Sequence, residues 1–391
     1  MIAFTYAQDK ESSVLGKWIF QSMTTITKAQ REEITIVYKD EKNVETLTFD
    51  DSGEITYNVT NDGIEKTGRG VWYSDGSHVV MPKTDGTLWS WGRNSDWGQG
   101  GVNDRTDRSS PVQIGSATDW ARAGTLQETS WGVKTDGTLW IWGRGYYGSL
   151  GLNQPHNTNL SSPVQIPGTN WERMYGITYS AFATKTDGTM WGWGNNSGGN
   201  LGQNDRTQRS SPVQIGDADW SQVDGAPPSN GGGIKTDGTL WLWGGNPNGN
   251  LGQNEAGDGT QRSSPTQVGS DTTWQQLSLG NKKTAAIKTD GTLWVWGRNA
   301  YGSLGRNEPS NSNYSSPVQI PGTWSSVSNS YSITLGQKTD GTLWSWGYNG
   351  AGQLGHNDRT ARSSPTQIPG TSWVYVRPFN GGNGFYASKN V

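Results

Sequence analysis

The sequence predicts an all-β protein folded as a seven-bladed β-propeller, and three observations support this fold class. A ten-residue motif, Lys-Thr-Asp-Gly-Thr-(Leu/Met)-Trp-x-Trp-Gly, occurs six times, beginning at Lys83, Lys134, Lys185, Lys235, Lys288 and Lys338. The copies recur at roughly 51 residues, a period typical of propellers when each unit consists of strands. Each copy also reads as short strands separated by turn residues, and the chain carries 22 tryptophans, most of them at repeat positions.

The fifth copy shows the strands expected in every repeat. We expect strands at 284–288, 292–296 and 317–320, and a fourth that begins at Trp324. Asp290-Gly291 takes the tight turn between the first two, because Asp-Gly readily adopts the positive φ angles of hairpin turns. Pro317 is the first residue of its strand, a position where the sheet needs no backbone N–H donor. We take these four antiparallel strands as one blade.

The tryptophans of each Trp-x-Trp are predicted to be structural. A strand alternates its side chains between two faces, so both tryptophans of one copy lie on the same face. Large rings at a constant position suit packing between blades. The residues concerned are Trp89, Trp91, Trp140, Trp142, Trp191, Trp193, Trp241, Trp243, Trp294, Trp296, Trp344 and Trp346.

The two ends of the chain interrupt the repeat. The composition changes near residue 70, so we divide the chain into an N-terminal β segment, 1–69, and a repeat propeller, 70–391. Residues 384–389 are in register with the first strand of a seventh unit, and 46–57 reads as a hairpin. We therefore expect a composite seventh blade, with one strand from the C-terminus and two or three from the N-terminal segment, which removes free sheet edges. The alternative is six blades and an independent N-terminal β domain. In the composite arrangement, residues 1–40 form an extra cap or docking arm.

The amino-acid composition limits the kinds of site and the classes of partner that the protein can have. The chain has no cysteine, which excludes disulfides and thiolate metal sites. It has 31 basic and 34 acidic residues, without the basic excess that nucleic-acid binding needs. We see no signal peptide and no membrane-inserting run. We expect a virion or extracellular location, with the cytoplasm left open.

No grouping of residues predicts catalysis, a cofactor or a metal. The aspartate of each Thr-Asp-Gly is explained by its hairpin turn, and the asparagine of each Leu-Gly-x-Asn by a hydrogen bond to loop backbone. Asn-Asp-Arg-Thr occurs in three copies, at 103–106, 204–207 and 357–360, and fits a solvated turn with an Asp–Arg pair better than a calcium loop. The three histidines, His78, His156 and His356, form no recurring group with serine or carboxylate residues. We therefore expect a protein that is not an enzyme.

The residues that the repeat does not explain are aromatic. They lie in the loop after Trp-Gly, which places them on one face of a propeller: Trp97, Tyr146, Tyr147, Tyr301 and Tyr348. Aromatics with small polar neighbours suit a protein interface or sugar stacking, and packing over a long loop remains the equal alternative. The second and fifth copies share Tyr-Gly-Ser-Leu-Gly in this loop. Arginines that precede Ser-Ser-Pro are candidates for a rim: Arg108, Arg209, Arg262 and Arg362.

The repeats resemble the regulator of chromosome condensation family, in the style of its bacterial and phage members. The matching residues of the fifth copy are Trp294, Trp296, Gly297, Leu304, Gly305, Asn307, Pro317 and Trp324. The resemblance covers about residues 71–391 and implies a seven-bladed propeller. It also implies several functions: nucleotide exchange on a small GTPase, inhibition of β-lactamases, and assembly roles. The scaffold alone does not choose among them.

We expect a non-enzymatic propeller that binds other proteins, as a structural or accessory component of a phage virion. One alternative is a glycan-binding lectin or adhesin on a cell surface, which would use the loop aromatics. Another is an enzyme-inhibitor propeller, and guanine-nucleotide exchange comes last. The partners are accordingly virion proteins or host glycans, with no nucleic acid, and no cofactor is expected.

Overall fold

The structure is a computed structural model of the chain. It describes residues 17–19, 34–39, 43–49, 54–61, 64–71, 73–74, 78–83, 85–126, 128–155, 157–177, 179–226, 230–371, 373–378 and 385–389. His156 and most of the predicted cap at 1–40 lie outside these residues. No helix in the described part of the chain is long and apolar enough to cross a bilayer.

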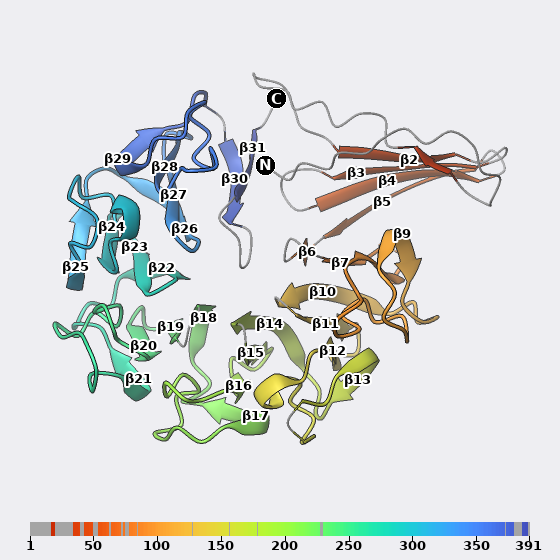
Figure 1. Cartoon of the computed structure of the whole chain (residues 1–391), viewed down its shortest axis with the longest axis horizontal. Coiled ribbons are helices and arrows are strands. Elements are labelled where there is room, and N and C mark those ends of the chain that lie inside the picture. The colour runs from red at the N-terminus through yellow and green to blue at the C-terminus, as the bar shows by residue number, and fades with distance from the viewer. Residues whose placement is uncertain are drawn as a thin grey trace.

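Six four-stranded antiparallel sheets are arranged around a common centre, one per repeat (Figure 1). We number them as blades 1 to 6 in chain order. The strands of blades 1 to 3 are β6 (Tyr73–Ser74), β7 (His78–Pro82), β8 (Leu88–Gly92), β9 (Arg108–Gln113), β10 (Trp120–Leu126), β11 (Thr129–Lys134), β12 (Leu139–Gly143), β13 (Leu160–Ile166), β14 (Trp171–Ile177), β15 (Ser180–Lys185), β16 (Met190–Gly194) and β17 (Arg209–Ile215).

Blades 4 to 6 repeat the same order. Their strands are β18 (Trp220–Ala226), β19 (Asn230–Lys235), β20 (Leu240–Gly244), β21 (Arg262–Gln267), β22 (Trp274–Gly280), β23 (Lys283–Lys288), β24 (Leu293–Gly297), β25 (Tyr314–Ile320), β26 (Trp324–Asn329), β27 (Ile333–Lys338), β28 (Leu343–Gly347) and β29 (Arg362–Gln367). Two short 3₁₀ turns, η1 (Tyr146–Gly148) and η2 (Ala300–Gly302), lie in the loops of blades 2 and 5.

The predicted strands exist, but the predicted division into blades was wrong by one strand. The strand that begins with the third tryptophan of a repeat opens a blade and lies nearest the centre, as Figure 1 shows for β10, β14, β18, β22 and β26. In blade 5, Trp274 pairs with Lys288 across β22 and β23. Trp324 instead pairs with Lys338 of the next blade. The segment 321–323 therefore crosses between blades and is no hairpin within one.

This shift of one strand also changes how the ring ends. The C-terminal residues supply two strands, β30 (Trp373–Pro378) and β31 (Phe385–Lys389), which pair with each other in the register of an opening hairpin. The five N-terminal strands form a separate antiparallel sheet: β1 (Lys17–Ile19), β2 (Ile34–Lys39), β3 (Asn43–Phe49), β4 (Glu54–Asn61) and β5 (Ile64–Val71). The predicted composite sheet is thus not formed by the described strands. Figure 1 places the N-terminal sheet between β30–β31 and blade 1.

The ten-residue motif builds the turn between the second and third strands of each blade and caps its tryptophans. In blade 5, Asp290 Oδ1 accepts the backbone N–H and the hydroxyl of Thr292, and the Trp294 indole donates to that hydroxyl at 2.9 Å. The ammonium of Lys288 lies 4.9 Å and 4.5 Å from the ring centroids of Trp274 and Trp294. The Asp–Thr–Trp chain recurs in all six motif copies, so its residues are structural.

In blades 2 to 5 the second tryptophan of Trp-x-Trp joins the blade to the one before it. The fully buried Trp243 of blade 4 donates its indole N–H to the Asn200 carbonyl of blade 3 at 2.8 Å. Trp142, Trp193 and Trp296 make the same bond to the preceding blade. These four buried rings therefore lie at blade junctions.

In blades 1 to 5 the asparagine of Leu-Gly-x-Asn, or Asn103 in the variant first copy, joins the blade to the next one. Asn204 has a φ of +59° and donates its backbone N–H to the Ser263 carbonyl at 2.7 Å. The corresponding asparagines of blades 1, 2, 4 and 5 share the positive φ and the bond. Asparagine tolerates the left-handed region better than most residues, which explains its recurrence.

Candidate interaction surface

The predicted aromatic residues lie at one end of the blades. In blade 2, Leu126 pairs with Thr129, Thr129 with Gly143, and Gly143 with Leu160. The long loop between the third and fourth strands therefore lies at the same sheet end as the short hairpin between the first two. We call this end of the propeller the long-loop face; the Thr-Asp-Gly turns lie at the opposite end.

Three of the predicted residues meet in a first cluster, which we define as Trp97, Arg144, Tyr146, Tyr147 and Tyr179. The Arg144 guanidinium carbon is 4.3 Å from the ring centroid of Trp97, 4.8 Å from Tyr146 and 5.7 Å from Tyr179. The three tyrosine rings lie 4.1 to 5.6 Å apart in edge-on contacts. Blades 1, 2 and 3 each contribute, so the cluster spans two blade junctions.

The charge of the first cluster is neutralised from within. Arg144 pairs with Glu128 at 2.5 Å, and both side chains are partly buried. Burial acts to lower the pKa of Arg144, but the hydrogen bond and charge of Glu128 outweigh it and raise that pKa. The hydrogen bond with Tyr146 raises the pKa of Tyr147. A cation held by a carboxylate and between aromatic faces is a rigid arrangement.

The other two predicted residues form a second cluster on the same face. Tyr301 of blade 5 and Tyr348 of blade 6 have ring centroids 4.8 Å apart. Tyr301 is 51% exposed, more than most large rings among the described residues. Tyr331, in the β26–β27 hairpin of blade 6, is equally exposed. The five predicted aromatics thus occupy two separate places.

Two of these tyrosines hold a strained backbone. Tyr147 and Tyr301 each have φ 55° and ψ 24°, the left-handed region, inside the 3₁₀ turns η1 and η2. For a bulky residue this conformation costs on the order of 1–3 kcal/mol and concentrates at functional sites. The aligned residues of the other blades, Trp97 among them, have no positive φ. The strain therefore belongs to the tyrosines of blades 2 and 5.

Sequence reasoning missed Arg144, Glu128 and Tyr179. Arginine follows Trp-Gly in blades 1, 2 and 5, so Arg144 read as a repeat residue. Glu128 and Tyr179 each precede the second strand of a blade, in a short hairpin that the sequence did not place beside the long loops. The aromatic character of Tyr179, one residue before a strand, was the available signal.

Comparison with known proteins identifies the repeat. The family model for the regulator of chromosome condensation (RCC1) repeat matches residues 136–178, 187–224, 237–287, 290–336 and 340–385, more than half of the chain. The chain belongs to the RCC1-repeat family. A second model of the same repeat matches residues 274–303. The six sheets are thus blades of an RCC1-type propeller.

Solved structures share this RCC1-type fold. The yeast protein RCC1 (Prp20), solved bound to Kap60, superposes with a TM-score of 0.66 at 18% identity, over 81% of this chain and 79% of that one. Human WBSCR16 gives a TM-score of 0.65 at 18% identity, over 80% and 84%. At this identity the likeness shows the fold alone.

One curated relative matches in sequence over a shorter stretch. The ultraviolet-B receptor UVR8 of Arabidopsis thaliana is 35% identical over 102 residues, 25% of this chain. The match spans 22% of the receptor, about a fifth of its length. The likeness therefore covers only part of either protein.

The predicted rim arginines of this RCC1-repeat chain are engaged in local ion pairs. Arg108, Arg209 and Arg362 each pair with the aspartate four residues earlier, and Arg262 pairs with Glu255. In blade 5, Tyr314 replaces the arginine and donates its hydroxyl to Glu308 at 2.5 Å. The aspartate of Asn-Asp-Arg-Thr does form an Asp–Arg pair, but its partner is Arg108 or an equivalent and not the arginine of that motif. The side chains of these rim residues are therefore engaged within their own loops.

The histidines of the described residues lie beside serines but form no catalytic pair. His78 is 2.7 Å from the Ser130 hydroxyl, and His356 is 2.9 Å from that of Ser345. Both serines are fully buried and donate to a backbone carbonyl, so they accept from histidine and have no proton to give up to it. Desolvation by burial lowers the pKa of His356. In the part of the chain that is described, no three His, Asp or Glu side chains gather to hold a metal.

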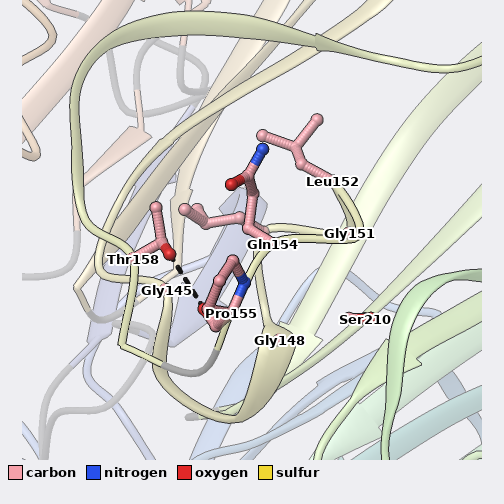
Figure 2. A pocket seen from close by; sticks show the side chains of 9 residues that line it. Gly145, Gly148, Gly151, Leu152, Gln154, Pro155, Thr158 and Ser210 are labelled. Carbon is pink, nitrogen blue, oxygen red and sulfur yellow. Dashed lines mark hydrogen bonds between the residues drawn. The ribbon is translucent and has the colours of Figure 1, made fainter.

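A small hollow lies under the blade-2 loop (Figure 2). Three glycines and two leucines of the loop line it, together with Gln154, Pro155, Thr158 and, from blade 3, Ser210. The Thr158 hydroxyl donates to the Pro155 carbonyl at 2.8 Å. The hollow has no charged lining residue. It serves the packing of the loop that carries Tyr146 and Tyr147.

Proposed function

We propose that this RCC1-repeat propeller works by binding other proteins through its long-loop face. One observation carries the proposal: two repeats hold a tyrosine in the same strained conformation, each in an aromatic cluster on that face. Tyrosine, tryptophan and arginine are the residues enriched at the energetic centres of protein interfaces. Solved relatives with this fold include yeast RCC1 (Prp20) bound to Kap60, and Prp20p studied for its binding to Gsp1p and histones.

Site-specific photo-crosslinking tests this proposal. A photoreactive phenylalanine analogue is placed at Tyr147 or Tyr301 in the full chain, and at Thr236 on the opposite face as the control. We expect the same defined protein to crosslink from the two tyrosine positions and not from Thr236. Equal crosslinking from all three positions would refute a binding role for the long-loop face.

We further propose that the partner belongs to a phage particle, with the chain as a structural or accessory virion component in a virion or extracellular location. Support comes from the near-identity of the repeats and from the nearly balanced charge, 31 basic against 34 acidic residues. Mass spectrometry of purified phage particles tests this virion assignment. Absence of the chain from the particles would contradict it. A non-enzymatic role fits a surface built of scaffold and aromatic clusters; measurable guanine-nucleotide release on a small GTPase would contradict it.

A second candidate function is glycan binding, favoured by the half-exposed ring of Tyr301. Sugar rings stack on such faces. Glycan-array binding that is lost in Tyr301→Ala would support it, and an empty array would argue against it.

We also propose that β30 and β31 begin a seventh blade that closes the ring. The pairing of Trp373 with Lys389 repeats the opening register of Trp274 with Lys288. Deleting residues 373–391 is then expected to lower the urea midpoint and enlarge the hydrodynamic radius, since blade 6 loses a neighbour. An unchanged midpoint would contradict closure.

A further inference from the structure

Blades 2 and 5 carry the same loop module, and this allows them to be compared position by position. Tyr147 and Tyr301 share φ and ψ. Arg144 donates its backbone N–H to the Glu128 carbonyl at 2.9 Å, and Arg298 donates to the Lys282 carbonyl at 2.8 Å. The two arginines are therefore equivalent, and Lys282 stands where the first module has Glu128.

Three of the groups that hold Arg144 are replaced around Arg298. The acid Glu128 becomes the base Lys282. Tyr146, the first residue of η1, becomes Ala300, the first residue of η2. Trp97 becomes Asn248, since Gly98 and Gly249, the residues that follow them, pack on equivalent serines of the next blade, Ser161 and Ser315. The fifth-blade arginine thus lacks the carboxylate and both of these rings.

The result is an uncompensated pair of cations in the module that carries Tyr301. Within the described residues, the side chains of Lys282 and Arg298 make no hydrogen bond or ion pair, and both are partly exposed. The acid of the same loop, Glu308, is already bound by the Tyr314 hydroxyl. Tyr301 lies three residues after Arg298, half-exposed and in contact with Tyr348. We call Lys282, Arg298, Tyr301 and Tyr348 the cationic patch.

We propose that the cationic patch binds an acidic segment of a partner protein, with a carboxylate at Arg298 and Lys282 and an apolar or aromatic side chain against Tyr301 and Tyr348. The first cluster is the internal precedent: there Glu128 supplies that carboxylate to the equivalent arginine at 2.5 Å. Guanidinium and carboxylate form paired, charge-assisted hydrogen bonds, which fix orientation as well as charge. The inference rests on the proposed protein-binding function and names the chemistry of the partner.

Peptide binding to the full chain tests the patch. The probe is a fluorescein-labelled peptide of alternating glutamate and tyrosine, with the matching glutamine–tyrosine peptide as its neutral control. By fluorescence anisotropy we expect at least about tenfold tighter binding of the glutamate peptide, falling as salt rises. Equal affinity for the two peptides would overturn the proposal. So would tighter binding of a single-stranded oligonucleotide than of the glutamate peptide.

Charge reversal shows whether the binding occurs at this patch. Lys282→Glu gives blade 5 the charge arrangement of blade 2 and is expected to weaken glutamate-peptide binding about tenfold or more. The matched control is Arg206→Glu, an exposed arginine in the long loop of blade 3 that undergoes the same change of charge. Its effect should stay below about twofold. Equal losses in the two variants would overturn the assignment.

Two further measurements keep the outcome interpretable. Lys282 has a φ of +59°, so Lys282→Asn, which tolerates that backbone, removes the charge with little risk to folding. Arg298→Gln removes the other cation, and both variants should weaken binding of the glutamate peptide. If no glutamate peptide binds while residues 147 and 301 still crosslink to a protein, the acidic-partner inference fails and the proposed function stands. If the crosslinks are also absent, both fail.

Discussion

Replacing Trp243 with phenylalanine tests whether indole hydrogen bonds hold the blades together. Trp243 is fully buried, and its N–H donates to the Asn200 carbonyl of the preceding blade at 2.8 Å. At the blade 1–2 and blade 4–5 junctions a serine or threonine hydroxyl shares the carbonyl. Blade 4 has Gly231 at that place, so Trp243 is the side chain on which the Asn200 carbonyl depends.

The expected cost has two parts. The buried Asn200 carbonyl loses its donor, which costs about 1–3 kcal/mol. The smaller phenylalanine ring leaves a space that adds about 1 kcal/mol. We therefore expect Trp243→Phe to lower the free energy of unfolding by about 2–4 kcal/mol.

Trp346 is the matched control because it has the same burial without the same bond. It is fully buried in blade 6, and its indole N–H has no acceptor within the described residues. The Ser303 carbonyl, which stands where an acceptor would be, is bonded by the Thr334 hydroxyl at 2.8 Å. Trp346→Phe should lose packing and no hydrogen bond. Its cost should be about 1–3 kcal/mol smaller than that of Trp243→Phe.

Urea unfolding followed by far-ultraviolet circular dichroism measures both variants. The midpoint and slope together give the free energy of unfolding, provided that the slope is unchanged. Equal destabilisation by the two substitutions would refute the role of the indole donor, because packing alone would then explain both.

Three further predictions concern the motif lysine, the loop asparagine and a buried aspartate. Lys185→Met removes a cation held 4.6 and 4.7 Å from two tryptophan rings and should cost about 1 kcal/mol in urea unfolding; no change in midpoint would contradict the stacking. Asn204→Ala should cost about 1 kcal/mol, because φ is +59° there, whereas Asn204→Gly should be nearly neutral. Burial raises the pKa of Asp224 to about 6, so the folded protein keeps a proton that the unfolded chain releases; stability should fall as pH rises through about 4 to 6, and Asp224→Asn should flatten that dependence.

The strands of the repeat could be predicted from sequence because period, turn residues and proline agree in every copy. The strands expected at 284–288, 292–296 and 317–320 are β23, β24 and β25, within a few residues at each end. The sequence could not predict which strand of the repeat begins a blade. The repeats have the same period whichever of the four strands is counted first. The pairing of Trp274 with Lys288 shows which strand begins the blade. Such a pairing cannot be recognised from the spacing of the repeats.

The candidate surface was predictable in part. Trp97, Tyr147 and Tyr301 could be recognised because the strand pattern does not demand them. Their division into two clusters depends on which blades adjoin, and the partner Glu128 lies in a hairpin remote from the long loop in sequence. A pattern read along one chain does not show which loops meet across a blade junction.

The contrast between Glu128 and Lys282 shows how a repeat can change its binding chemistry without changing its fold. Each residue gives the scaffold only a backbone carbonyl, which accepts the N–H of Arg144 or Arg298. The fold therefore fixes the backbone position of this residue but places no requirement on the charge of its side chain. In blade 2 that freedom is used to neutralise the arginine from within, and in blade 5 it adds a second cation beside Tyr301. Because η1 and η2 share their backbone angles at Tyr147 and Tyr301, Glu128→Lys with Tyr146→Ala is expected to give blade 2 a second acid-binding patch. The double variant should roughly double the number of glutamate peptides bound per chain.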